Sequence, residues 1–181
     1  MGTELQGKKI AILAADGVEQ VELVEPRDAV HAAGGTTELL SIDAGEIQGM
    51  EGDIDQADRF PVDKKVADAS VDDYAGLLLP GGVANPDTLR ADADVIAFLQ
   101  AFFRTGKPVG VICHGPWTLV EADLVRGRTL TSFPSIRTDI VNAGGTWVDE
   151  EVVTDQGLVS SRNPDDLPAF VDAIATALQA G

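Results

Sequence analysis

The sequence predicts an α/β protein, a three-layer sandwich in which helices cover both faces of a mostly parallel sheet. Two patterns support this prediction. Short apolar runs without polar alternation recur along the chain, as in strands that are buried on both faces. Amphipathic segments of helical length separate these runs, and strands that alternate with helices form parallel sheets. Because 181 residues suffice for one full core and are few for two, we expect a single domain over residues 1–181.

The N-terminal part is expected to open as strand, helix and strand. The apolar run 8–14 predicts the first strand. Apolar residues at roughly helical spacing predict a helix within 19–33, and Pro26 requires this helix either to begin nearby or to kink there. Residues 37–41 predict the second strand of a β-α-β unit.

The rest of the chain continues the alternation after one polar interruption. Residues 43–70 are acidic and predict a loop with a hairpin or an edge strand, with a weak strand candidate at 60–66. Further strands are expected at 74–79, 109–112, 130–131, 147–150, 151–154 and 158–161. Further helices are expected at 92–104, 115–123, 136–143 and 165–180.

Composition excludes several classes of function. The net charge of −17 disfavours binding to nucleic acid or to anionic membranes. One cysteine cannot form an internal disulfide, and no apolar run has the length of a signal peptide core or a membrane span, so we expect a cytoplasmic protein. With two histidines and one cysteine, no metal site is expected, and no cofactor is expected either.

The segment 110–115 (GVICHG) carries the strongest functional signal. A strand ends, Cys113 stands at the corner, and a helix follows after Gly115, as in a nucleophile elbow. The positive end of the helix dipole would favour a thiolate, so we expect the pKa of Cys113 to be lowered. The alternative is that Cys113 is a buried small hydrophobic residue.

Three neighbours could assist such a thiol. His114 could orient or deprotonate it, although adjacent side chains seldom face each other on a turn, so that His114 would need a third group to hold it. Gly81 and Gly82 end another strand and could offer backbone N–H groups as an oxyanion hole. The alternatives are a structural histidine and an ordinary turn.

Two carboxyl groups follow the first strand. Glu19 and Glu22 lie three residues apart and would share one face of a helix. A carboxyl group pressed against the thiol would have a raised pKa, remain protonated and donate a hydrogen bond to sulfur. Exposed glutamates on a helix are the alternative.

At these residues the sequence resembles a known family. The matching segments are GVEQVELVEP (17–26), LLLPGG (77–82), GKPVGVICHGPWTLVEADLVRGRTLTS (106–132), NAGGTWVDEEVV (142–153) and SRNPDDLPAF (161–170). The chain is similar to the PfpI family of the class I glutamine amidotransferase-like superfamily, which includes the Parkinsonism-associated deglycase. Within that family it looks most like the bacterial general stress proteins.

The resemblance implies a flavodoxin-like fold with Cys113 as the nucleophile and His114 as its neighbour. It places the family's thiol-contacting glutamate on Glu22 and a second acidic position on Glu19. It also implies a homo-oligomer, a dimer or a hexamer, in which an acidic residue of the adjacent subunit reaches the histidine. That position matches Asp87, although the preceding turn is one residue longer here; the alternative for Asp87 is a helix N-cap.

The resemblance implies a stress-response protein acting as a thiol-dependent hydrolase, either deglycase- or glyoxalase-like or peptidase-like. Its substrates would be small electrophilic carbonyl compounds or glycated molecules. The alternative is a non-catalytic redox sensor or chaperone whose Cys113 is oxidised under stress. A glutamine amidotransferase is disfavoured because no histidine follows position 114.

Overall fold

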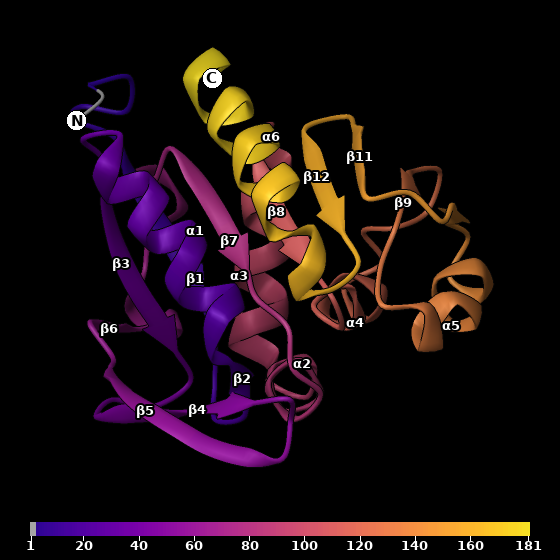
Figure 1. Cartoon of the computed structure of the whole chain (residues 1–181), viewed down its shortest axis with the longest axis horizontal. Helices are drawn as coiled ribbons and strands as arrows, with labels where there is room; N and C mark the ends of the chain where they lie inside the picture. The colour runs from indigo at the N-terminus through magenta and orange to yellow at the C-terminus, as the bar shows by residue number, and fades with distance from the viewer. Residues whose placement is uncertain (1–2) are drawn as a thin grey trace.

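The computed structural model describes residues 3–181, and its centre is a seven-stranded sheet of order β11-β12-β8-β7-β1-β3-β6 (Figure 1). The strands are β1 Lys9–Leu13, β3 Thr36–Ser41, β6 Lys64–Lys65, β7 Gly76–Leu79, β8 Val109–Ile112, β11 Val152–Asp155 and β12 Leu158–Ser161. Neighbouring strands are parallel except for β11 and β12, which are antiparallel. The predicted α/β class, with a flavodoxin-like and mostly parallel sheet, is confirmed.

Helices cover both faces of this sheet. In Figure 1, α1 and α6 lie in front of the strands, and α3 and α4 lie behind them. The helices are α1 Gln20–Ala32, α2 Ala84–Arg90, α3 Ala93–Arg104, α4 Pro116–Glu121, α5 Arg137–Asn142 and α6 Leu167–Ala180. Each face therefore has its own hydrophobic core, one against α1 and α6 and the other against α2, α3 and α4.

The strand sequences explain why two cores form. Successive side chains of a strand point to opposite faces, so a strand that is buried on both sides has no polar alternation. In β1, Ile10 and Ile12 pack with α1 and α6, whereas Ala11 and Leu13 pack with the helices of the other face. Burial on both faces therefore explains why these strands appear as apolar runs in the sequence.

Two smaller sheets lie outside the main one. A three-stranded sheet consists of β2 Val18–Glu19, β4 Glu46–Glu51 and β5 Asp55–Pro61, and a pair of short strands consists of β9 Thr129–Leu130 and β10 Thr146–Trp147. The hairpin expected within 43–70 is β4–β5. The weak strand candidate at 60–66 is not one strand, because it covers the last two residues of β5 and the two-residue strand β6. The second strand of the hairpin ends at Pro61, because the chain then turns to place the two-residue β6 on the edge of the main sheet.

Two helices differ from the expectation. Helix α1 begins at Gln20 and continues through Pro26, so a start near Pro26 is wrong. Helix α2 was not expected, because the segment Asn-Pro-Asp suggested a cap. Asn85 instead lies inside α2 and is fully buried. Its side chain accepts a hydrogen bond from the N–H of Ala15 and donates to the carbonyl oxygens of Pro80 and Gly81, which ties the ends of β1 and β7 together.

The first described residues and the end of α6 lie at the amino ends of the strands, at the top of Figure 1. The Lys8 ammonium group, just before β1, donates a 2.5 Å hydrogen bond to the carbonyl oxygen of Leu178 in α6. The carboxyl ends of the strands and the β4–β5 hairpin lie at the opposite end of the molecule. Within the described part of the chain, no helix has the length and apolar character needed to cross a membrane.

Candidate active site

Cys113 follows β8 at the carboxyl end of the sheet, in a left-handed backbone conformation with φ of +62°. Its N–H donates to the Ser161 carbonyl oxygen at 3.1 Å, and its own carbonyl oxygen accepts the N–H of Phe133 at 2.8 Å. Helix α4 begins three residues later at Pro116. A left-handed non-glycine residue is strained, and the hydrogen bonds on both sides of Cys113 hold it in place.

The turn after β7 packs tightly against the cysteine. A Cβ atom on Gly81 would lie 2.7 Å from the Cys113 Cβ and 2.6 Å from Glu22 Oε2. Gly82 has a φ of +79°, and a Cβ there would lie 2.4 Å from the carbonyl oxygen of Gly17. Only glycine therefore fits at these two positions, which explains how the loops after β1, β7 and β8 converge on one sulfur atom.

His114 contacts the thiol of its sequence neighbour. Its Nδ1 lies 3.2 Å from Cys113 Sγ, and its Nε2 lies 3.2 Å from the hydroxyl oxygen of Ser135. The two adjacent side chains therefore meet here, at a residue whose backbone is left-handed. Burial lowers the pKa of His114, which favours a neutral imidazole.

The His114 ring is also enclosed by aromatic side chains. It stacks on Phe133 with ring centroids 4.6 Å apart and an interplanar angle of 22°. The Trp117 ring lies 5.3 Å away, and its indole N–H donates to Asp139 at 2.9 Å. These contacts hold the imidazole plane in a single orientation.

Glu22, in the first turn of α1, is only 2% exposed. One oxygen, Oε2, accepts the N–H of Gly81 at 2.7 Å, and the other, Oε1, has no hydrogen-bond partner within residues 3–181. Burial raises the pKa of Glu22 from 4.5 to about 8. The carboxyl group is therefore protonated at neutral pH.

The pKa of Cys113 differs from the sequence expectation. Burial raises it, and a negative charge on Glu22 would raise it further, whereas hydrogen bonds from the backbone N–H groups of Gly82 and His114 lower it. The expected lowering by a helix dipole is wrong for the single chain. The thiol is 5% exposed, and α4 has only six residues, so desolvation outweighs the helix end.

Glu19 holds the β4–β5 hairpin instead of the thiol. It directly precedes α1, and its two carboxylate oxygens accept the N–H groups of Gly52 at 3.1 Å and Asp53 at 3.3 Å. Asp53, at the hairpin tip, has a φ of +62° and accepts the N–H of Val83 at 2.7 Å. Glu19 therefore connects the hairpin tip to the turn that contains Gly81 and Gly82.

The two predicted N–H donors lie in different settings. The N–H of Gly81 is bound to Glu22, whereas the N–H of Gly82 faces the Cys113 sulfur. The backbone N–H of His114 faces the sulfur as well. The pair of donors at the thiol is thus Gly82 and His114.

Asp87 lies on α2 with its side chain 60% exposed. It forms an ion pair of 3.1 Å with Arg90 and makes no polar contact with His114 within the described chain. The N-cap alternative is wrong, because α2 begins earlier and Val83 stands at that position. The Arg90 guanidinium also lies over the Trp117 ring, 4.7 Å from its centroid.

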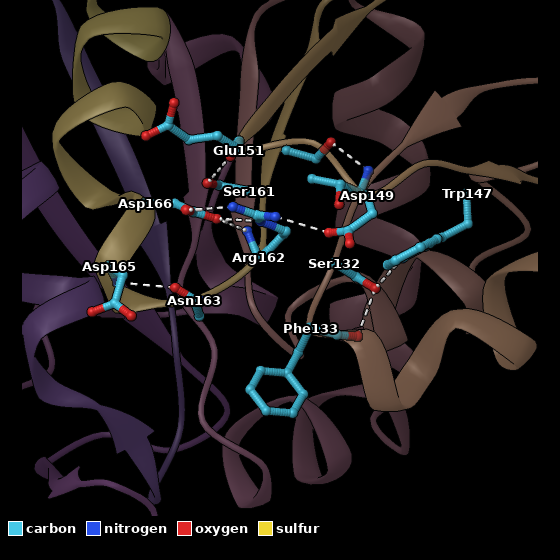
Figure 2. Close-up of polar contacts among 12 residues, drawn as sticks. Ser132, Phe133, Trp147, Asp149, Glu151, Ser161, Arg162, Asn163, Asp165 and Asp166 are labelled. Carbon is cyan, nitrogen blue, oxygen red and sulfur yellow. Dashed lines mark hydrogen bonds and ion pairs between the residues drawn. The ribbon is translucent and has the colours of Figure 1, made fainter.

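A second group of polar contacts lies in the loops that follow β9, β10 and β12 (Figure 2). Arg162, which follows β12, binds Asp166 through two nitrogens at 2.8 and 3.0 Å and Asp149 through a third at 2.8 Å. The Trp147 indole N–H donates to the Ser132 hydroxyl oxygen at 2.9 Å, and Ser132 donates to the carbonyl oxygen of Phe133 at 2.9 Å. The two bonds of Ser132 hold the segment that carries Phe133 and Ser135.

Sequence reasoning missed Ser135, Phe133 and Asn85. Ser135 lies 21 residues from His114, and no local pattern signals its contact with the imidazole. The segment Ser-Phe-Pro-Ser between a short strand and a helix was the only available sign of a special turn.

Within residues 3–181, no group of three His, Cys, Asp or Glu side chains could hold a metal ion.

Comparison with known proteins places this geometry in a family. The DJ-1/PfpI family matches residues 8–177. "Putative cysteine protease YraA" of Bacillus subtilis is 42% identical over 164 residues, which are 90% of this chain and 94% of that protein. "Protein/nucleic acid deglycase 2" of Escherichia coli is 42% identical over 165 residues, which are 90% of this chain and 93% of that protein.

Solved structures agree with the fold. A two-domain protein of Anabaena variabilis with DJ-1/ThiJ/PfpI-like and ferritin-like domains aligns with a TM-score of 0.89 and 33% identity, over 94% of this chain and 48% of that one. DJ-1β of Drosophila melanogaster aligns with a TM-score of 0.84 and 26% identity, over 96% of this chain and 91% of that one. The resemblance seen in the sequence is confirmed, and the chain belongs to the DJ-1/PfpI family.

Proposed function

We propose that the chain is a cytoplasmic, stress-related, thiol-dependent hydrolase with Cys113 as its nucleophile. The observation that carries the proposal is the convergence of three groups on one strained residue. Cys113 Sγ lies 3.2 Å from His114 Nδ1, and the N–H groups of Gly82 and His114 face the sulfur. Glu22, with its raised pKa, completes the pocket around the thiol. Each group has a role in nucleophilic catalysis by a thiol.

The chemistry follows from the positions of the protons. Because burial raises the pKa of Cys113 and lowers that of His114, the proton leaves the sulfur as the substrate is attacked. The S–H bond breaks, His114 Nδ1 takes the proton, the sulfur electron pair forms a bond to an electrophilic carbonyl carbon, and the carbonyl π electrons move onto oxygen. N–H donors near the sulfur are suited to stabilise that oxyanion. The protonated Glu22 can donate a hydrogen bond to the thiolate or to the adduct.

Small carbonyl compounds and glycated side chains are the proposed substrates. One relative is named a putative cysteine protease and another a protein/nucleic acid deglycase, and a thiol nucleophile that attacks a carbon bound to oxygen would suit both names. Beside the site, a hollow of about 820 Å³ lies between the β4–β5 hairpin and α2. Gly17, Asp53 and Val83 line it, and Val83 directly follows the Gly82 N–H that faces the sulfur. Nucleic acid and membranes are not proposed as partners, because the net charge is −17.

The test is a substrate screen of the wild type beside Cys113→Ser and Cys113→Ala. Methylglyoxal, methylglyoxal-treated peptides and unmodified peptides serve as the three substrate classes. We expect turnover of many equivalents per chain in the wild type, a loss of at least about a thousandfold in both variants, and a thermal melt close to that of the wild type. Activity that survives in Cys113→Ala would remove the nucleophile from the proposal.

One observation favours a second candidate, a redox sensor or chaperone. Glu22 Oε1 is buried and has no hydrogen-bond partner among residues 3–181, so that it can donate a hydrogen bond to an oxygen of an oxidised Cys113. With one cysteine in the chain, no internal disulfide can intercept a sulfenic acid. The same screen discriminates the two candidates, because a sensor reacts once per thiol whereas an enzyme turns over.

A further inference from the structure

His114 Nε2, the ring nitrogen that faces away from the thiol, has its own partner. The hydroxyl oxygen of Ser135 lies 3.2 Å from it. Ser135 belongs to a short 3₁₀ turn, Pro134–Ile136, between β9 and α5, and its side chain is exposed at the surface. Asp87 of the same chain forms an ion pair with Arg90. Within one chain, Ser135 therefore stands where a histidine base needs an orienting group.

The two nitrogens of a neutral imidazole cannot both carry a proton. Cys113 is buried, and a thiol S–H that points at Nδ1 requires a lone pair on that nitrogen. The ring proton must then be on Nε2, where the Ser135 oxygen can accept it. A serine hydroxyl both donates and accepts, and exposure allows water to accept the proton of Ser135 itself.

The position of Ser135 is fixed by the segment around it. Phe133 donates its N–H to the Cys113 carbonyl oxygen at 2.8 Å and stacks its ring on His114. Ser132, which is fully buried, accepts the indole N–H of Trp147 and donates to the carbonyl oxygen of Phe133, as Figure 2 shows. The residues from Ser132 to Ser135 are thus fastened both to the cysteine and to β10, and they carry the hydroxyl group to the imidazole.

We propose that Ser135 is a positioning residue for His114: its hydroxyl oxygen accepts the Nε2–H and keeps the lone pair of Nδ1 directed at Cys113. The inference rests on the proposed function in so far as His114 is the base. When the thiol transfers its proton, the S–H bond breaks and an N–H bond forms at Nδ1. The positive charge that develops on the ring strengthens the hydrogen bond from Nε2 to Ser135.

The tautomer of His114 tests this proposal without any substrate. The chain has two histidines, so a protein labelled with ¹⁵N-histidine gives two ring systems in a long-range ¹H–¹⁵N spectrum, and His31→Gln assigns them. We expect the Nε2–H tautomer for His114 in the wild type at neutral pH. In Ser135→Ala, the share of the Nδ1–H tautomer should rise about threefold to tenfold, the equivalent of one hydrogen bond.

Alkylation of Cys113 provides a second readout. Iodoacetamide should react about threefold to tenfold more slowly with Ser135→Ala at neutral pH, and Ser135→Thr, which keeps a hydroxyl group, should restore both the rate and the tautomer. Thr138→Ala is the matched control, because Thr138 is an exposed hydroxyl residue on the next turn of the same segment. It should behave as the wild type does.

Three results would overturn the proposal. They are an Nδ1–H tautomer in the wild type, a tautomer ratio in Ser135→Ala equal to that of the wild type, and a ratio that responds to Asp87→Asn but not to Ser135→Ala. The last result would assign the role to the carboxylate of an adjacent subunit. Because the tautomer is measured without turnover, a protein that fails every substrate screen can still confirm or contradict the role of Ser135.

Discussion

Cys113 shows how one residue's backbone conformation creates a site. A φ of +62° at a non-glycine residue costs of the order of 1–3 kcal/mol. In return, two side chains that are adjacent in sequence come within 3.2 Å of each other. The sulfur also faces the N–H groups of Gly82 and His114. The strain is thus localised at the residue on which the proposed chemistry depends.

At the residue scale, the raised pKa of Glu22 predicts how the stability of the fold depends on pH. Its pKa is about 8 in the folded chain and near 4.5 when unfolded, so between these pH values the folded state holds a proton that the unfolded state has released. The contribution of Glu22 to the free energy of unfolding is therefore present in full below pH 4.5 and is lost as the pH rises toward 8. Glu22→Gln cannot release a proton, and its advantage over the wild type should grow across that window to roughly 3–5 kcal/mol.

Urea denaturation of both proteins at intervals from pH 5 to 9 measures this difference. Glu25→Gln, which changes an exposed glutamate of the same helix, should follow the wild type throughout. Parallel curves for Glu22→Gln and the wild type would show that Glu22 is ionised at neutral pH and that its environment is more polar than the structure indicates.

At the scale of elements, the carboxylate of Glu19 fastens the tip of the β4–β5 hairpin. Glu19 accepts the N–H groups of Gly52 and Asp53 at the hairpin tip, and Asp53 passes the connection to Val83. Since the hairpin borders the hollow beside the thiol, its order determines how that hollow is shaped.

We predict that Glu19→Ala loosens this hairpin while leaving the main sheet intact. Loss of two hydrogen bonds to a charged group should speed amide exchange in residues 46–61 by at least about tenfold. Hydrogen–deuterium exchange with mass spectrometry measures this against peptides that contain β1 and β8. Glu19→Gln keeps one acceptor and should show a smaller change. Equal protection of 46–61 in Glu19→Ala and the wild type would contradict the role.

The elements also show what a sequence can and cannot reveal. The strand at 109–112 was predicted with its observed bounds, because four apolar residues between Pro108 and Cys113 have no other explanation. Helix α2 was missed because Asn-Pro-Asp suggested a cap, whereas Asn85 lies buried inside the helix and its three hydrogen bonds reach Ala15, Pro80 and Gly81. Ser135 was missed for a similar reason, since its contact with His114 exists only after the chain has folded. Local patterns reveal strands and turns, whereas contacts between distant loops need coordinates.

At the scale of the whole molecule, the proposal concerns a site that two neighbouring chains build together. We propose a homo-oligomer, a dimer or a hexamer, in which Asp87 reaches the site of an adjacent subunit, beside the His114 imidazole that Ser135 orients. The support is that Asp87 is exposed on α2, which borders the hollow beside the thiol.

Mixing two inactive variants tests this arrangement. Cys113→Ala and Asp87→Ala chains should each be inactive alone and should regain up to about a quarter of the wild-type activity per site after subunit exchange, because a hybrid interface can contain one intact site. Mass spectrometry of the mixed oligomers verifies the exchange. Full activity of Asp87→Ala by itself, or no recovery despite exchange, would show that each chain builds its site alone.

The placement of the chain ends has a practical consequence. Lys8 and Leu178 meet at the amino ends of the strands, whereas Cys113 lies at the carboxyl ends. A biotin group or a fluorescent protein fused at either terminus would therefore project away from the thiol. Chains captured on a sensor chip through such a tag would all turn the end of the sheet that carries Cys113 toward the flowing solution, and two dyes, one on each terminus, would lie too close together to report on events at the opposite end.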